Sequence, residues 1–159
     1  MLYYWQNKEI VIYIWEINKP SICSQDKAKM KFDSANMNKI LIVDDEPDLT
    51  QVFTLALEDY GFKVDSFNDP QEALSKYAPG LYDLVILDIK MPKMSGLELY
   101  HEVKKKDNNA NVCFLTASEL FYEELRKEKY CALDRNLFIQ KPIQNEELVK
   151  EINKMIEKE

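Results

Sequence analysis

The stretch VDDEP, residues 43–47, places two adjacent carboxylates, Asp44 and Asp45, directly after a run of apolar residues. At an effective dielectric of about 20, two unit charges roughly 4 Å apart repel by about 4 kcal/mol, and burying either charge without a partner costs more. Carboxylate oxygens are also the ligands that a hard cation such as Mg²⁺ prefers. We therefore expect positive charge to lie beside this pair in the folded chain.

Three more polar residues end or follow apolar runs further along the chain: Asp88, Thr116 and Lys141. An aspartate can act as a nucleophile in group transfer, a threonine hydroxyl can donate a hydrogen bond, and a lysine supplies a compact positive charge. If folding gathers these residues with Asp44 and Asp45, the product is an acidic site with one lysine, able to hold a divalent cation.

The elements that must position these residues alternate along the chain from Met37 onward. Continuous apolar runs, such as residues 40–43 and 84–87, are typical of strands buried on both faces of a parallel sheet. Five strands are predicted, at Lys39 to Asp44, Phe62 to Phe67, Tyr82 to Asp88, Asn111 to Thr116 and Asn136 to Gln140. Helical segments separate them, so the sequence predicts an α/β fold: a doubly wound five-stranded parallel sheet with helices on both faces.

Local signals predict where the helices lie. Apolar residues recur at helical spacing from Leu49 to Tyr60 and from Leu148 to Ile156. The stretch Asp69 to Glu72 offers a cap and a proline at the first helical position, and Ser95 to Glu98 is a capping-box pattern. A weaker helix is predicted after Ser118.

The architecture predicts where ligands bind. In doubly wound sheets they bind beyond the carboxyl ends of the strands, at the point where the strand order reverses. If the order is 2-1-3-4-5, that point lies between the first and third strands, and Asp44, Asp45 and Asp88 converge there. Taken alone, Asp45 has a simpler interpretation as the cap of the helix that starts near Pro47.

The first part of the chain, residues 1–36, differs in composition from the rest. It contains both tryptophans and an apolar run, residues 10–15, that is far shorter than the roughly 20 residues of a membrane span. It also lacks the basic start and cleavage site of a secretory signal. Three interpretations stay open: a strand or dimer contact, a peripheral membrane anchor, or translated sequence upstream of a natural start at Met37. We favour the last, and assign residues 1–36 to an N-terminal extension and 37–159 to one domain.

Composition limits the class of protein. With 46% hydrophobic and 31% charged residues, the chain is of the soluble globular type. The net charge of −7 argues against a nucleic-acid partner, because lysine and arginine dominate phosphate binding. Cys23, Cys113 and Cys131 lack the spacing of a metal site or disulfide framework, and indicate reduced thiols in a cytoplasmic protein. His101 has no second histidine or cysteine nearby, so we interpret it as an ordinary helix residue.

Four motifs together resemble the receiver domain of two-component response regulators. They are VDDE at residues 43–46, DIKMP at residues 88–92 leading to Gly96, Thr116-Ala117, and Lys141-Pro142. Each is weak alone, but all four occur in order, each at the carboxyl end of its strand. The resemblance covers about residues 38 to 158 and implies a flavodoxin-like fold with strand order 2-1-3-4-5, so residues 37–159 are expected to be a receiver domain.

The resemblance implies a phosphoryl-transfer site. Asp88 aligns with the family's phosphoacceptor, and Lys141 with the lysine that meets the phosphoryl group. Thr116 aligns with the switch hydroxyl and Phe138 with the switch aromatic, which would rotate inward as Thr116 moves; the simpler interpretation of Phe138 is a core aromatic. The resemblance also implies that the peptide bond between Lys141 and Pro142 is cis, and an X-Pro bond is the one kind where cis costs little.

The resemblance also implies a cofactor, Mg²⁺. Its expected ligands are the carboxylates of Asp44, Asp45 and Asp88 and the backbone carbonyl of Lys90. Three aspartates bring −3, the ion +2 and Lys141 +1, so the unmodified site sums to zero. Phosphorylation of Asp88 would replace a charge of −1 with about −2 and add acceptor oxygens.

The expected function is that of a stand-alone receiver. The phosphoryl group would come from a histidine kinase or a histidine phosphotransfer protein. The output would be phosphorylation-dependent binding of a downstream protein that the sequence does not name, or transfer of the phosphoryl group to a phosphotransfer protein in a phosphorelay. The protein would not be an enzyme beyond its own phosphotransfer and slow autodephosphorylation. No nucleic acid or membrane span is expected, and localisation is expected to be cytoplasmic.

Two rival functions and some departures from the family pattern also follow from the sequence. A phosphatase of the haloacid-dehalogenase type needs a second acid two residues after the nucleophile, where this chain has Lys90. A binding module with this fold and no phosphorylation is the other rival. Lys90 and Ser118 border the site and are expected to tune the lifetime of the phosphoryl group, and residues 131–135 lack the Gly-Ala that the family often shows.

Overall fold

The computed structural model describes residues 37–117 and 137–157. The N-terminal extension, Cys23, Cys131 and the helix predicted after Ser118 lie outside this part of the chain. In chain order the described elements are β1 (Lys39–Val43), α3 (Pro47–Asp59), β2 (Lys63–Phe67), α4 (Pro70–Lys76), β3 (Leu84–Asp88), α5 (Gly96–Lys106), β4 (Val112–Thr116), β5 (Phe138–Gln140) and α7 (Asn145–Ile156).

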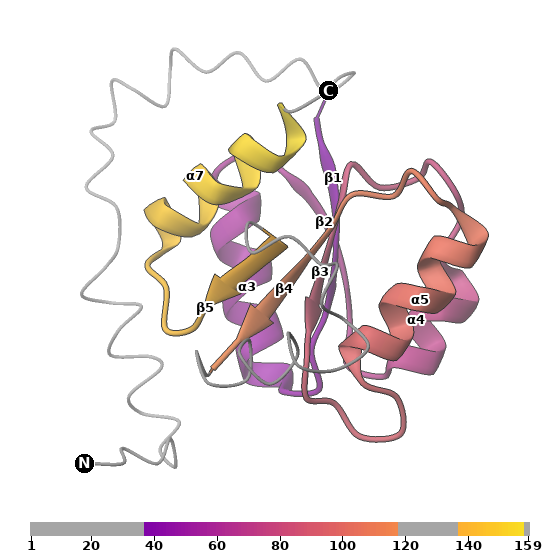
Figure 1. The fold of residues 1–159 in the computed structure, drawn as a ribbon. Coiled ribbons are helices and arrows are strands. Elements are labelled where there is room, and N and C mark those ends of the chain that lie inside the picture. The colour runs from indigo at the N-terminus through magenta and orange to yellow at the C-terminus, as the bar shows by residue number, and fades with distance from the viewer. Residues whose placement is uncertain (1–36, 118–136, 158–159) are drawn as a thin grey trace, which may run out of the picture.

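The strands form one five-stranded parallel sheet in the order β2-β1-β3-β4-β5, which confirms the predicted fold and strand order (Figure 1). Because β1 lies between β2 and β3, the chain crosses to opposite sides of β1 after successive strands. The carboxyl ends of β1 and β3 are therefore neighbours, with Val43 paired with Leu87. This is the switch point that the sequence predicts as the place of the site.

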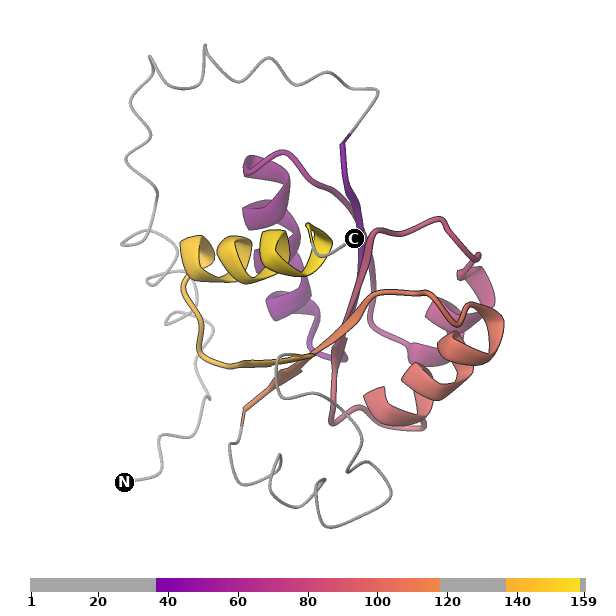
Figure 2. The ribbon, with the colours of Figure 1, turned by 45° about the horizontal axis from the view of Figure 1, so that its top comes forward.

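Of the helices that the structure describes, two lie on each face of the sheet. Figures 1 and 2 show α3 and α7 on one side and α4 and α5 on the other. Alternate residues of β1 face opposite layers: Ile40 and Ile42 pack with residues of α3 and α7, whereas Leu41 and Val43 pack with residues of α4 and α5. All four are at most 2% exposed. This burial on both faces explains the continuous apolar run, and each such side chain contributes roughly 1.5–3 kcal/mol.

Helix starts follow the predicted local signals on the α4 and α5 side. The Asp69 carboxylate accepts hydrogen bonds from the backbone N–H groups of Gln71 and Glu72, and Pro70 occupies the first turn. Ser95 and Glu98 form a complete capping box, in which each side chain bonds the backbone of the other. These caps fix where α4 and α5 begin, directly beside the loops that follow β2 and β3.

Two details at the end of β1 differ from the sequence interpretation. The strand ends at Val43 and not at Asp44, because the carbonyl of Asp44 accepts a hydrogen bond from the Asn68 side chain and not from a strand. The simpler interpretation of Asp45 as a helix cap is wrong. Glu46 is the N-cap of α3, and its N–H donates to Oδ1 of Asp44 at 3.0 Å.

The other strands agree with prediction to within two residues at either end, which is the usual uncertainty of such boundaries. The bond between Lys141 and Pro142 is cis, as expected. In the part of the chain that the structure describes, no helix combines the length and the apolar character that a membrane crossing requires.

Candidate functional site

Three charged side chains from three strand ends meet at the carboxyl edge of the sheet. Asp44 follows β1, Asp88 ends β3, and Lys141 follows β5. The Lys141 Nζ lies 2.7 Å from Oδ2 of Asp44 and 2.7 Å from Oδ1 of Asp88. The lysine therefore supplies the compensating charge that the adjacent carboxylates predict, from a residue 97 positions further along the chain than Asp44.

Each of these charges is largely removed from water. The Asp44 side chain is 0% exposed, Asp88 13% and Lys141 14%. Burial raises the pKa of Asp88 above its ordinary value, although the Lys141 ammonium opposes this shift. Burial alone would lower the pKa of Lys141, but the carboxylates of Asp44 and Asp88 outweigh it and the pKa is raised. The lysine is accordingly charged at neutral pH.

Main-chain groups hold the remaining carboxylate oxygens. Oδ2 of Asp88 accepts the N–H of Lys90 at 2.8 Å, and Oδ1 of Asp44 accepts the N–H of Glu46. Both carboxylates therefore have a partner on each oxygen, which fixes their rotamers. Asp45 is different: it is half-buried, and among residues 37–117 and 137–157 its carboxylate has no hydrogen bond or ion pair.

These residues suit a hard divalent cation. No group of three His, Cys, Asp or Glu side chains is close enough to enclose an ion within the described residues. Mg²⁺ does not require such a cage, because it usually keeps several waters and binds through one or two carboxylates. The donors present are all oxygens, their charge with Lys141 is −2 (three aspartates at −3 and one lysine at +1), and the Asp45 carboxylate has no partner in the described chain. The chemistry of the donor set therefore fits the ion.

The two switch candidates lie on β4 and β5. Thr116 ends β4 and is buried, and its carbonyl accepts the N–H of Lys141 at 2.7 Å. Phe138 is half-buried in β5, and its ring stacks on that of Phe114 with centroids 5.1 Å apart. Phe114 in turn contacts Tyr100 of α5. The ring of Phe138 thus already packs on the α5 side of the sheet, and its inward rotation stays a prediction.

Comparison with known proteins decides the family. The family model described as the response regulator receiver domain matches residues 40–153 of this chain. The chain belongs to the response regulator receiver family. Its relatives include the transcriptional regulatory protein DltR of Streptococcus agalactiae, with 34% identity over 72% of this chain and 50% of that protein. Another is the response regulator ArlR of Staphylococcus saprophyticus, with 32% identity over 77% of this chain and 54% of that protein. The chain thus spans about half the length of these relatives.

Solved structures agree with this family. The response regulator TrrA of Thermotoga maritima, determined in complex with Mg²⁺ and BeF, has 36% identity and a TM-score of 0.63, over 75% of this chain and 99% of that one. The chemotaxis protein CheY4 of Vibrio cholerae has 28% identity and a TM-score of 0.62, over 76% of this chain and 99% of that one. The chain is therefore a receiver domain of the two-component response regulator type, which favours this family over the dehalogenase-type phosphatase.

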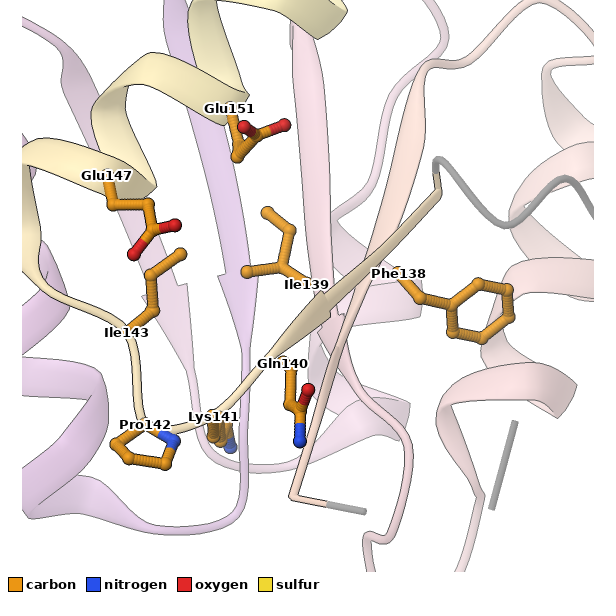
Figure 3. Close-up of a pocket in the computed structure, with 8 residues that line it drawn as sticks. All are labelled: Phe138, Ile139, Gln140, Lys141, Pro142, Ile143, Glu147 and Glu151. Carbon is orange, nitrogen blue, oxygen red and sulfur yellow. The ribbon is translucent and has the colours of Figure 1, made fainter. Parts of the chain in front are cut away.

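The receiver also has a cavity of about 340 Å³ between β5 and α7. Figure 3 shows that Ile139, Ile143, Glu147 and Glu151 face it, whereas the Phe138 ring lies on the opposite side of β5. Lys141 lies at one end of its lining, but Asp44 and Asp88 are not part of it. This cavity therefore lies beside the acidic site and does not include its two carboxylates.

Two residues that contact the site were missed at the sequence level. Asn68 and Thr50 form hydrogen bonds to the carbonyl of Asp44. Thr50 could have been noticed, because it is a polar residue on the buried face of α3 with Phe53 and Leu57. Asn68 carries no comparable signal, since a polar residue after a strand is ordinary in a loop.

Cys113 and His101, which the sequence assigns no chemistry, lie away from these contacts. Cys113 is buried in β4, and burial raises the pKa of its thiol to about 12. Such a thiol is protonated and inert at neutral pH. His101 is exposed on α5 and lies against the ring of Tyr100.

Gly96 is required by the close approach of two backbones. A Cβ at this position would lie 2.1 Å from the carbonyl oxygen of Asp88 and 3.2 Å from Cα of Ile89. Gly96→Ala is therefore expected to displace the backbone of Asp88, to lower the free energy of unfolding by about 3 kcal/mol and to slow phosphoryl acceptance. Urea unfolding and labelling with a small phosphodonor measure the two effects.

Gly80→Ala is the matched control for this prediction. Gly80 has a φ of +69° but no atom within 4 Å of a Cβ. The substitution should cost about 1 kcal/mol through backbone strain and leave phosphoryl acceptance unchanged. Equal labelling rates in Gly96→Ala and the parent protein would contradict a role for this close approach in positioning Asp88.

Proposed function

We propose that Asp88 of this receiver accepts a phosphoryl group from a histidine kinase or a histidine phosphotransfer protein, in a reaction that requires Mg²⁺. The observation that carries the proposal is the position of Lys141, whose Nζ lies 2.7 Å from both Asp44 and Asp88. That ammonium fixes the Asp88 carboxylate and leaves a positive charge where phosphoryl oxygens would arrive. The roles of the other residues follow from this arrangement.

In the proposed reaction an oxygen of Asp88 attacks the phosphorus of a phosphohistidine. The new P–O bond forms as the P–N bond of the donor breaks, and the imidazole leaves with the electron pair. Phosphoryl transfer depends mainly on in-line positioning and charge stabilisation, so no general base is needed. Lys141 would bind the arriving phosphoryl oxygens, and the Thr116 hydroxyl would move to them. Lys90 and Phe138 would then affect the lifetime and the readout of the modified state.

Mg²⁺ would be held by the carboxylates of Asp44, Asp45 and Asp88 and the backbone carbonyl of Lys90. When bound, it would neutralise negative charge that develops on the transferred group. Asp45 is the ligand with most freedom to turn toward the ion, because its carboxylate has no partner in the described chain. Binding of Mg²⁺ and BeF by TrrA, a relative with 36% identity, supports this assignment.

The phosphorylated receiver would signal by changing its affinity for a downstream protein. Its relatives DltR and ArlR are named as regulators and are about twice as long as the matched region. The stand-alone output, the absence of a nucleic-acid partner and the cytoplasmic location accordingly stay predictions. The same applies to the assignment of residues 1–36 and 37–159, and to the expectation that the receiver catalyses only its own phosphotransfer and slow hydrolysis.

BeF₃⁻ binding tests this proposal without a kinase. The receiver is expected to bind BeF₃⁻ only when Mg²⁺ is present, as monitored by ¹⁹F NMR. Asp45→Ala should raise the Mg²⁺ concentration needed for half-saturation at least about tenfold, because Mg²⁺ sites have few carboxylate ligands and this substitution removes one of them.

Asp59→Ala is the control, since Asp59 is an exposed carboxylate at the far end of α3. It should not change the half-saturating Mg²⁺ concentration. If Asp45→Ala behaves like Asp59→Ala, Asp45 is not a ligand of the ion; if the parent protein binds no BeF₃⁻ with Mg²⁺, the proposed function is wrong.

A further inference from the structure

The main chain of Asp44 is held by the last residue of β2 and by the residue that follows it. Its N–H donates to the carbonyl of Phe67 at 3.2 Å, and its carbonyl accepts Nδ2 of Asn68 at 2.7 Å. The first contact continues the pairing of β1 with β2. The second is made by a side chain, and it replaces the strand hydrogen bond that would otherwise follow.

Thr50 joins this contact from α3. Its hydroxyl is 2.8 Å from the carbonyl of Glu46 and 3.1 Å from that of Asp44, and it accepts Nδ2 of Asn68 at 2.8 Å. A threonine in a helix often bonds the carbonyl four residues earlier, so the Glu46 contact is ordinary. The bonds with Asn68 and Asp44 are not of this local kind, because they join residues of three separate elements. Thr50 is only 2% exposed, so its hydroxyl depends on these partners.

These bonds fix one particular peptide group. The carbonyl of Asp44 belongs to the peptide unit that joins Asp44 to Asp45, and the orientation of that unit sets where the Asp45 side chain starts. The Asp44 carboxylate is held separately, by Lys141 and by the N–H of Glu46. Asn68 and Thr50 therefore set the direction of Asp45 relative to a carboxylate that is already fixed.

Among the described residues, this network constrains Asp45 through its backbone. Its carboxylate makes no hydrogen bond or ion pair with any residue in the described ranges, so side-chain contacts there do not orient it. Its backbone does, and that backbone is tied through the Asp44 carbonyl. The two amide protons of Asn68 supply both links, one to the carbonyl and one to the Thr50 hydroxyl.

We infer that Asn68 and Thr50 are positioning residues for the divalent cation, because they hold the Asp44–Asp45 peptide in the orientation that directs Asp45 toward the ion. This inference rests on the proposed function. Groups that orient a metal ligand typically change metal affinity 10- to 100-fold when removed. Asn68 donates to the Asp44 carbonyl at 2.7 Å, whereas the single proton of the Thr50 hydroxyl faces two carbonyls and that of Asp44 is the more distant, so the larger effect belongs to Asn68.

The test is calorimetric titration of the folded receiver with Mg²⁺ alone, without a phosphodonor. Asn68→Ala should raise the Kd for Mg²⁺ by about tenfold, and Thr50→Val by a smaller factor. Asn68→Leu keeps the approximate size of the side chain but removes both donor hydrogens without adding charge, so it should weaken binding as well. Thr50→Ser retains the hydroxyl and should restore the parent Kd.

Thr54→Val is the matched control. Thr54 donates from the same helix to the carbonyl of Thr50 at 2.8 Å, which is the ordinary local bond without a link to Asp44. It should lower the melting temperature less than Thr50→Val, because Thr54 makes only this local bond, and it should leave the Kd unchanged. A role in stability alone would move the melting temperatures and not the Kd.

The outcomes separate the two proposals. A raised Kd in both Asn68 variants, with Thr54→Val unchanged, supports the positioning role. If the parent protein binds Mg²⁺ and the Asn68 and Thr50 variants bind it within about twofold of the parent, the inference is overturned and the proposed function stands. If the parent protein binds no Mg²⁺, the proposed function fails and this inference fails with it.

Discussion

Asp88→Asn should reduce labelling of the receiver by a small phosphodonor with Mg²⁺ to background. An amide has nearly the shape of the carboxylate but no anionic oxygen to attack phosphorus. The fold should persist, because Lys141 keeps its ion pair with Asp44 and the amide oxygen of the variant can still accept the N–H of Lys90. Intact-protein mass spectrometry measures the labelling, and circular dichroism confirms that the variant is folded.

Asp83→Asn is a control on the same segment of chain. Asp83 is an exposed residue just before β3, at the opposite end of the strand from Asp88, and it accepts the N–H of Lys39. Its substitution should leave labelling at the parent level. Labelling of Asp88→Asn at that same level would show that another residue is the acceptor.

Lys141→Met should lower the free energy of unfolding by about 3 kcal/mol, because it leaves the buried Asp44 and Asp88 carboxylates without their cation. The Asp44 side chain is 0% exposed, so water cannot replace the lost ion pair with Lys141. Chemical denaturation without Mg²⁺ measures the loss. Lys154→Met removes the lysine of an ion pair with Glu151 in which both partners are substantially exposed, and should change stability by about 0.5 kcal/mol or less.

Mg²⁺ and pH give this prediction two further readouts. Saturating Mg²⁺ should reduce the difference in free energy of unfolding between Lys141→Met and the parent, because the ion binds the folded state and neutralises the same carboxylates. The pKa of Asp88 is already raised by burial, with Lys141 opposing the shift. Without Lys141 the pKa of Asp88 rises further. The variant is therefore more stable at pH values where Asp88 is protonated, and it loses this stability as the pH rises through that pKa. The difference in free energy of unfolding between variant and parent should therefore be smaller near pH 4 than at pH 7. An equal difference at both pH values would contradict the role of the ion pair.

The sheet and the edge that carries the site could be predicted, because strands that are buried on both faces need continuous apolar runs, which are visible in the sequence. Ile40 and Leu41 face opposite helical layers, so an uninterrupted apolar run was required at that strand. The polar residues that follow such runs then had to lie at the carboxyl edge. Asp44, Asp88 and Lys141 are brought together for this reason, although 97 positions separate the first and last.

The details of the β1–α3 turn could not be predicted in this way. Whether Asp44 continues the strand depends on which group reaches its carbonyl, and that group is the side chain of Asn68, 24 positions later. Asp45 and Glu46 are both acceptable before Pro47, and Glu46 becomes the N-cap, with its N–H donating to the Asp44 carboxylate that Lys141 holds from the end of β5. Such choices are made by contacts between elements, which local patterns do not encode.

The most direct test of the central claim is to locate the phosphoryl group. The receiver would be treated with a small phosphodonor and Mg²⁺, and the modified residue identified by peptide mass spectrometry under conditions that preserve acyl phosphates. We expect one phosphoryl group per chain, on Asp88, and none when Mg²⁺ is removed with a chelator. A phosphoryl group on any other residue, or labelling that persists without the metal, would contradict the account.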